Sequence, residues 1–161
     1  MEYFEGWIAA SWVAQGGGGD RRGRGAVFAA TGRTWFAPDG TTEQGEDAYL
    51  VVMNPFAVDA VFDVVLYTPK RAPIRSSALT DHVLRPGKSV AFRLNAFAEG
   101  EASVGAEVRT SRLGAWPCRR LGITRDGGIR SVIGTTATGP VTLLPVGGGA
   151  GQSTVDVVDP G

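Results

Sequence analysis

The sequence predicts an all-β protein built as an antiparallel, immunoglobulin-like (Ig-like) β-sandwich. Short segments alternate between apolar and polar residues, and proline or glycine turns separate them at intervals of about ten residues. No window of a dozen residues shows a helical period. With 43% apolar and 20% charged residues, the 161-residue chain has ordinary globular composition, which excludes wholesale disorder.

The first part of the chain predicts one or two strands and then a break. Residues 1–15 alternate loosely, and their aromatic residues together with Gly6 disfavour a helix. Residues 16–25, GGGGDRRGRG, interrupt all periodicity and predict a loop or linker. The organised part of the chain therefore begins near Thr34.

The segment from Thr34 to Phe56 is expected to organise the fold. It contains a short aromatic strand, a polar Gly-rich turn, an apolar strand from Ala48 to Met53, and a stop at Asn54-Pro55. A strand that is apolar on both faces is typical of a central position in a sheet.

Three later segments alternate cleanly: Val61–Tyr67, Ser89–Leu94 and Ser103–Arg109. Each is predicted to bury one face, with Asp63, Gly105, Glu107 and Arg109 among the residues on the outward face. The predicted core consists of Leu50, Val52, Phe62, Val64, Leu66, Val90, Phe92, Leu94, Val104 and Val108.

The last twenty residues resemble the opening of the sandwich. Residues 142–161 give a short strand, a Gly-rich turn, an apolar strand Val155–Val158 and the pair Asp159-Pro160, which lies 105 residues after Asn54-Pro55. A repeat with this period predicts tandem domains. The expected division is residues 1–22 from a preceding repeat, a linker at 23–33, a complete sandwich at 34–125, a linker or last strand at 126–140, and the truncated start of a following repeat at 141–161.

Residues 35–55 resemble the hallmark of a bacterial family of unknown function, which reads W-Y-F-A-x-G-x-T and then G-x-D-x-Y-L-x-x-x-N-P. Phe36, Ala37 and Pro38 depart from this pattern. The matching residues are Trp35, Gly40, Thr42, Gly45, Asp47, Tyr49, Leu50, Asn54 and Pro55. A V-x-P-G-x-S-x-x-x-x-L segment is matched by Pro86, Gly87, Ser89 and Leu94, and a V-x-S-x-x-G segment loosely by Val108, Ser111 and Gly114.

The resemblance covers residues 33–121 and implies tandem Ig-like sandwiches in exported or envelope-anchored proteins. It implies no activity. An extracellular or cell-envelope location follows from the resemblance alone, because the N-terminus MEYFEGWIAASWVAQ lacks the basic and apolar regions of a secretion signal. Truncation is the simplest explanation for the missing signal.

The composition excludes several classes of partner. Sixteen basic residues balance sixteen acidic ones, and the cluster Arg21, Arg22 and Arg24 is interpreted as a solvated linker, so no nucleic acid is expected. No apolar run reaches the ~20 residues needed for a membrane span.

The single cysteine, Cys118, is interpreted as a buried small residue, the orphan of a pair outside this chain, or a reactive thiol.

Each candidate site has an ordinary explanation. The carboxylates Asp39, Glu43, Glu46 and Asp47 suggest calcium, but their spacing fits no EF-hand and favours a solvated turn. His82 beside Asp81 lacks a nucleophile motif and is expected at the surface. The glycine runs lack the lysine of a phosphate loop. The tryptophans Trp7, Trp12, Trp35 and Trp116 favour packing over sugar stacking; Trp35 and Trp116 are the ligand candidates.

The sequence therefore predicts a non-catalytic structural or interaction module of an exported cell-surface protein. The expected partners are neighbouring repeats, other cell-surface proteins and glycans, with no catalytic residue, metal or cofactor. The alternative is a carbohydrate-binding module that uses exposed tryptophans, and a hydrolase using His82 and Cys118 is the third hypothesis. Two coplanar, exposed indoles would favour the carbohydrate-binding module, and a glycan array without a binder would remove it.

Overall fold

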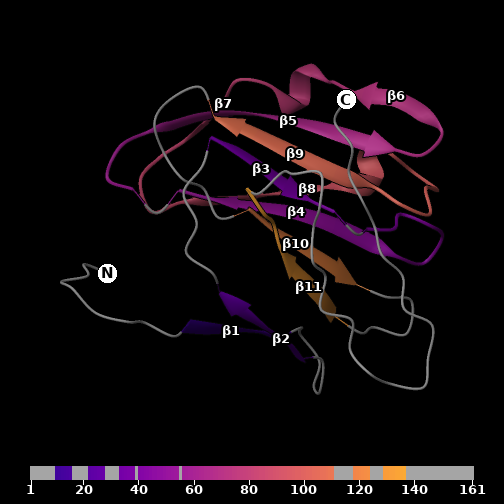
Figure 1. Ribbon diagram of the computed structural model, residues 1–161, viewed down its shortest axis with the longest axis horizontal. Coiled ribbons are helices and arrows are strands. Elements are labelled where there is room, and N and C mark those ends of the chain that lie inside the picture. Colours follow the sequence, from indigo (N-terminus) through magenta and orange to yellow (C-terminus); the bar gives the residue numbers. More distant parts are fainter. Residues whose placement is uncertain are drawn as a thin grey trace.

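The computed structural model describes residues 10–15, 22–27, 33–38, 40–54, 56–110, 118–123 and 129–136. These residues form β-strands and two short 3-10 helices (Figure 1), so the prediction of a mostly β, antiparallel protein is confirmed. The strands are β1 (Ala10–Gln15), β2 (Arg22–Val27), β3 (Thr34–Ala37), β4 (Asp47–Met53), β5 (Ala60–Thr68), β6 (Arg71–Ile74), β7 (His82–Leu84), β8 (Ser89–Arg93), β9 (Gly105–Thr110), β10 (Cys118–Ile123) and β11 (Ile129–Ile133). The 3-10 helices are η1 (Ser77–Leu79) and η2 (Leu94–Ala96).

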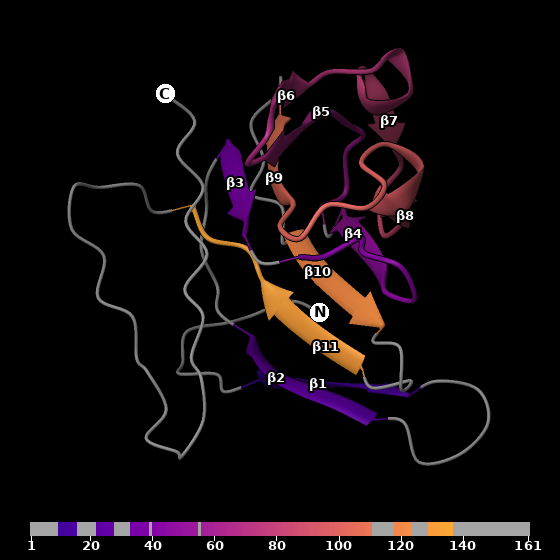
Figure 2. The ribbon, with the colours of Figure 1, turned by 90° about the vertical axis from the view of Figure 1, so that its right-hand side faces the viewer.

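Two antiparallel sheets make up the body of the molecule. One has the strand order β11-β10-β4-β8, and the other has the order β3-β9-β5-β6 with β7 also paired to β5. The central position predicted for the strand from Ala48 to Met53 is confirmed, since β4 lies between β10 and β8. A separate two-stranded sheet of β1 and β2 lies next to β11 (Figure 2).

The strand order differs from the immunoglobulin order in more than one respect. In that order, written ABED and CFG, the first strand joins the sheet of the second. Here β3 and β4 lie in different sheets, because β3 pairs with β9 whereas β4 pairs with β10. The described strands therefore form two antiparallel sheets, but they do not reproduce the immunoglobulin strand order.

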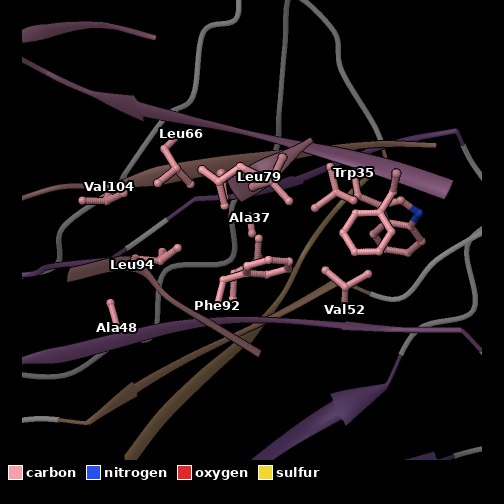
Figure 3. Packing of buried hydrophobic residues seen from close by; sticks show 14 of the residues in the cluster. Trp35, Ala37, Ala48, Val52, Leu66, Leu79, Phe92, Leu94 and Val104 are labelled. Atoms are coloured by element: carbon pink, nitrogen blue, oxygen red, sulfur yellow. The ribbon is translucent and has the colours of Figure 1, made fainter. Parts of the chain in front are cut away.

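Side chains from both sheets fill the space between them (Figure 3). Nine of the ten predicted core residues are buried, and the tenth, Val90, is half-buried and packs against the cluster. Trp35, Leu79 and Leu84 also belong to the core. Burying a large apolar side chain stabilises a fold by about 1.5–3 kcal/mol, so this cluster supplies the main driving force for folding.

Two features of the sequence prediction were wrong or incomplete. The predicted loop at 16–25 is wrong from Arg22 onward, since β2 begins there and pairs with β1. The sequence analysis did not predict β10, because its residues show no alternating pattern. This strand pairs with β4 on one side and β11 on the other. The predicted strand Val155–Val158, like residues 1–9, lies outside the described residues.

Candidate functional site

The first tryptophan named as a ligand residue lies in the core. Trp35 on β3 is 1% exposed, so its ring cannot stack on a sugar, and the structure contradicts its role in an exposed platform. Its indole Nε1 is buried without a hydrogen-bond partner among the described residues. Trp116 and Trp7 lie outside the described residues, and Trp12 lies on β1.

The histidine and the cysteine occupy different strands. His82 begins β7 and is half-buried; its ring stacks on Phe62 at 5.5 Å between centroids and meets Phe92 edge-on at 4.7 Å. Its Nε2 lies 2.8 Å from the carbonyl oxygen of Ala78. Cys118 begins β10 in the other sheet, where it pairs with Val52. The contacts of His82 are those of a packed aromatic residue.

The acidic turn before β4 is built by hydrogen bonds and one ion pair. Asp47 Oδ1 accepts from Arg93 Nε at 2.9 Å and Nη2 at 2.7 Å, linking β4 to β8. Gly45 has a φ of 88°, and Glu46 N donates to the carbonyl of Glu43 at 2.9 Å. Among the described residues no group of three or more potential ligand side chains is arranged to hold a metal ion.

The hallmark residue Asn54 is completely buried and holds two loops together. Its Nδ2 donates to the carbonyl oxygens of Val58 at 2.7 Å and Leu84 at 2.8 Å, and its Oδ1 accepts from the amide of Phe56 at 2.9 Å. Its backbone carbonyl accepts from the amide of Gly87 at 2.9 Å. A buried amide must be paired on both its oxygen and its nitrogen, and here the partners are backbone groups.

Thr42 plays the same part at the opposite end of β4. Its backbone amide donates to the carbonyl of Glu101 at 2.9 Å, and its Oγ1 donates to the carbonyl of Ala98 and accepts from the amide of Glu101 at 3.1 Å. The buried Glu101 carboxylate forms an ion pair with Arg71 Nε at 2.9 Å. The polar hallmark residues described so far therefore hold the fold together.

A cluster of charged and hydroxyl side chains that the sequence did not predict lies on the outer face of the larger sheet. Glu107 on β9 was expected to face solvent, but it is 1% exposed. Its Oε2 accepts from the hydroxyl of Tyr67 at 2.6 Å, and its Oε1 pairs with Arg109 Nε. We call Tyr67, Glu107 and Arg109 the outer-face triad.

Neighbouring strands explain why Glu107 is buried. In the register of the sheet Glu107 lies between Phe36 on β3 and Val65 on β5, and both of these residues are buried on this same outer face. Gly105 on the same face is also buried, contrary to expectation. The sequence held one sign that this outer face is partly buried, namely Val65, an apolar residue at an outward position. Val65 could not be placed beside Glu107 before the register of β5 and β9 was known.

The triad shifts two pKa values in the same direction. Burial, followed by the hydrogen bond to Glu107, raises the pKa of the Tyr67 phenol. The hydrogen bond and charge of Glu107 raise the pKa of the Arg109 guanidinium. Each Glu107 oxygen already accepts from a neighbour, whereas the Arg109 side chain is 51% exposed. The arrangement can therefore fix Tyr67 and present a cation to an anionic group on a partner.

Comparison with protein families places the chain. The model of a family of unknown function, DUF5719, matches residues 5–115, and the chain belongs to this family. No curated protein matches the sequence.

Two solved structures resemble the fold. The crystal structure of Thermotoga maritima 1070 matches with a TM-score of 0.52 and 18% identity, covering 66% of this chain and 96% of that protein. The Anabaena sensory rhodopsin transducer matches with a TM-score of 0.44 and 9% identity, covering 57% of this chain and 99% of that protein. At this identity the Thermotoga match shows the fold alone. No helix among the described residues is long and apolar enough to cross a membrane.

Proposed function

We propose that the chain is a non-catalytic structural or interaction module of an exported bacterial cell-surface protein that is built from tandem Ig-like sandwiches. The observation that carries the proposal is the use of the polar hallmark residues. Thr42, Asp47 and Asn54 direct their side chains to backbone groups or to a neighbouring arginine within the fold. Hallmark residues that make contacts within the fold support a structural role for the chain.

The outer-face triad supports an interaction role for this scaffold. Arg109 is held by a buried carboxylate and is half-exposed, so its orientation is fixed before a partner arrives. A cation fixed in advance loses less conformational entropy on binding than a free side chain does. The partners that the proposal names are neighbouring repeats, other cell-surface proteins and glycans.

Surface labelling of intact cells tests the location on which this function depends. Lys70 and Lys88 are both exposed. An amine-reactive reagent that cannot cross membranes is expected to label the peptides containing these two lysines on intact cells. A variant carrying Lys70→Arg and Lys88→Arg is the matched control and should show no labelling at these positions. Labelling that requires cell lysis would contradict the proposal.

A further inference from the structure

The hairpin of β1 and β2 forms a sheet of its own. Its register runs from Ala10 opposite Val27 to Gln15 opposite Arg22. Among the strands that the structure describes, β1 pairs with β2 alone. One edge of β1 therefore has no strand beside it in the described part of the chain.

A second hairpin with the same layout occurs about one domain later. β10 begins 108 residues after β1, at Cys118 against Ala10, and both strands have six residues. β11 begins 107 residues after β2, at Ile129 against Arg22. The segments that follow the two hairpins begin at Thr34 and Thr142, again 108 residues apart. This spacing is the one expected of two equivalent parts of a repeated unit.

The equivalent strands differ in their pairing. β10 pairs with β4 along the whole of β10 and completes the smaller sheet, with β11 outermost. The family match at residues 5–115 contains β1 to β9 and excludes β10 and β11. The strand β10, which pairs with β4, therefore lies outside the matched segment. The β1–β2 hairpin lies inside this segment and pairs with neither of the two larger sheets among the described strands.

The residue pattern of the β1–β2 hairpin suits a position beside β4. In β10, positions 118, 120 and 122 pair with Val52, Leu50 and Ala48, which are buried, so these positions lie on the core side of the sheet. The equivalent positions of β1 are Ala10, Trp12 and Ala14. Their cross-strand partners on β2 are Val27, Gly25 and Gly23, so this face of the hairpin carries only apolar residues and glycine.

The opposite face of the hairpin is mostly polar. The register places Ser11, Gln15, Arg22 and Arg24 on it, together with Val13 and Ala26. A two-stranded hairpin is marginally stable in water by itself, and a strand with an open edge is a template for pairing with another chain. An apolar face on one side, a mostly polar face on the other and an open edge suit a strand that completes another sheet.

We propose that β1 is a donor strand that pairs antiparallel with β4 of a second copy of this sandwich, in the place that β10 occupies here. In that complex β2 becomes the outermost strand, as β11 is here. Each unit then receives one hairpin and gives one, so units join head to tail. The inference rests on the proposed function and names the surface through which neighbouring repeats associate.

Replacing the β10–β11 hairpin by the β1–β2 hairpin within the full chain tests whether β1 can pair with β4 as β10 does. Residues 118–134 are replaced by residues 10–27, and the β4 amides are followed by hydrogen exchange alongside the melting temperature. The exchanged chain is expected to keep its β4 protection and to melt within about 4 °C of the parent. Leu121→Pro in the parent, which removes an amide from β10, defines the loss seen when β4 is unpaired and should lower β4 protection about tenfold or more.

Two further measurements make the result decisive. The exchanged chain with Val13→Pro in its insert should lose β4 protection as the Leu121→Pro parent does. A peptide of residues 8–29 added to the Leu121→Pro chain should restore protection, and the same peptide with Val13→Pro should not. The proposal is overturned if the exchanged chain is as unprotected as the Leu121→Pro parent, if the peptide restores nothing, or if Leu121→Pro leaves β4 protected. None of these outcomes changes the result of the surface-labelling experiment. A failure of the donor-strand proposal can therefore be distinguished from a failure of the proposed function.

Discussion

Single buried polar residues set the geometry of the loops in this protein. Asn54 joins the loop after β4 to the end of β7 through its two amide donors, and Thr42 joins the turn before β4 to the segment around Glu101. Gly87 adopts a φ of 66°, a left-handed conformation that a residue with a β-carbon adopts only at a cost. Each of these residues has at least one backbone partner that is distant in sequence.

Asn54→Ala is expected to lower the free energy of unfolding by about 2–3 kcal/mol, because it leaves two carbonyls, of which that of Leu84 is buried, and one amide without their partner. Urea denaturation measures the change. Lys70→Ala at an exposed turn is the control and should change stability by less than about 0.5 kcal/mol. A small effect of Asn54→Ala would mean that water replaces the lost bonds.

Trp35→Ala is expected to cost about 3–5 kcal/mol, since it opens a cavity at a residue that is 1% exposed. Trp35→Phe keeps a ring and removes an indole N–H that has no partner among the described residues, so it should cost clearly less. Thermal and urea unfolding of both variants give the comparison. Equal losses in the two variants would show that ring size, rather than burial of an aromatic group, controls this position.

At the scale of the strands, register rather than residue type decides which outward residues are buried. Phe36, Glu107 and Val65 occupy one row across β3, β9 and β5, and all three are buried on the outer face. The Tyr67 hydroxyl reaches Glu107 from the next row of β5. The triad is thus a property of three strands together.

The raised pKa of Tyr67 predicts a loss of stability at alkaline pH. The folded state holds the phenolic proton more tightly than the unfolded state, so this contribution is complete below the ordinary pKa of about 10 and is lost as pH rises through the folded value. Stability of the parent chain should therefore fall above pH 10. Tyr67→Phe should show a smaller fall in urea titrations at pH 9 and 11. An identical fall in both chains would exclude Tyr67 as the source.

At the scale of the whole molecule, the two hairpins have opposite relations to the sandwich. β10 and β11 form part of the smaller sheet, whereas β1 and β2 lie beside β11 without pairing to it. The sequence predicted that flanking segments belong to neighbouring repeats. Nothing in the described residues tests that division, and it remains a prediction.

Truncation distinguishes the two hairpins. Removing residues 1–27 is expected to change the melting temperature by no more than about 4 °C, because no ladder among the described strands joins β1 or β2 to the two larger sheets. Removing residues 113–161 takes away β10 and should lower the melting temperature strongly and favour association, because it exposes the edge of β4. Calorimetry and size-exclusion chromatography check both results. A strong loss on removing residues 1–27 would show that the hairpin belongs to the sandwich.

The sequence by itself determined the class of fold, the central position of β4 and nearly all of the core. Alternation with period two follows directly from strand geometry, so residues such as Phe62, Val64 and Leu66 could be assigned to a buried face without knowledge of their partners. The tertiary structure decided which strands pair. It placed Trp35 in the core, Glu107 under its neighbours and β10 beside β4. Pairing depends on contacts between residues far apart in the chain, and no local pattern carries that information.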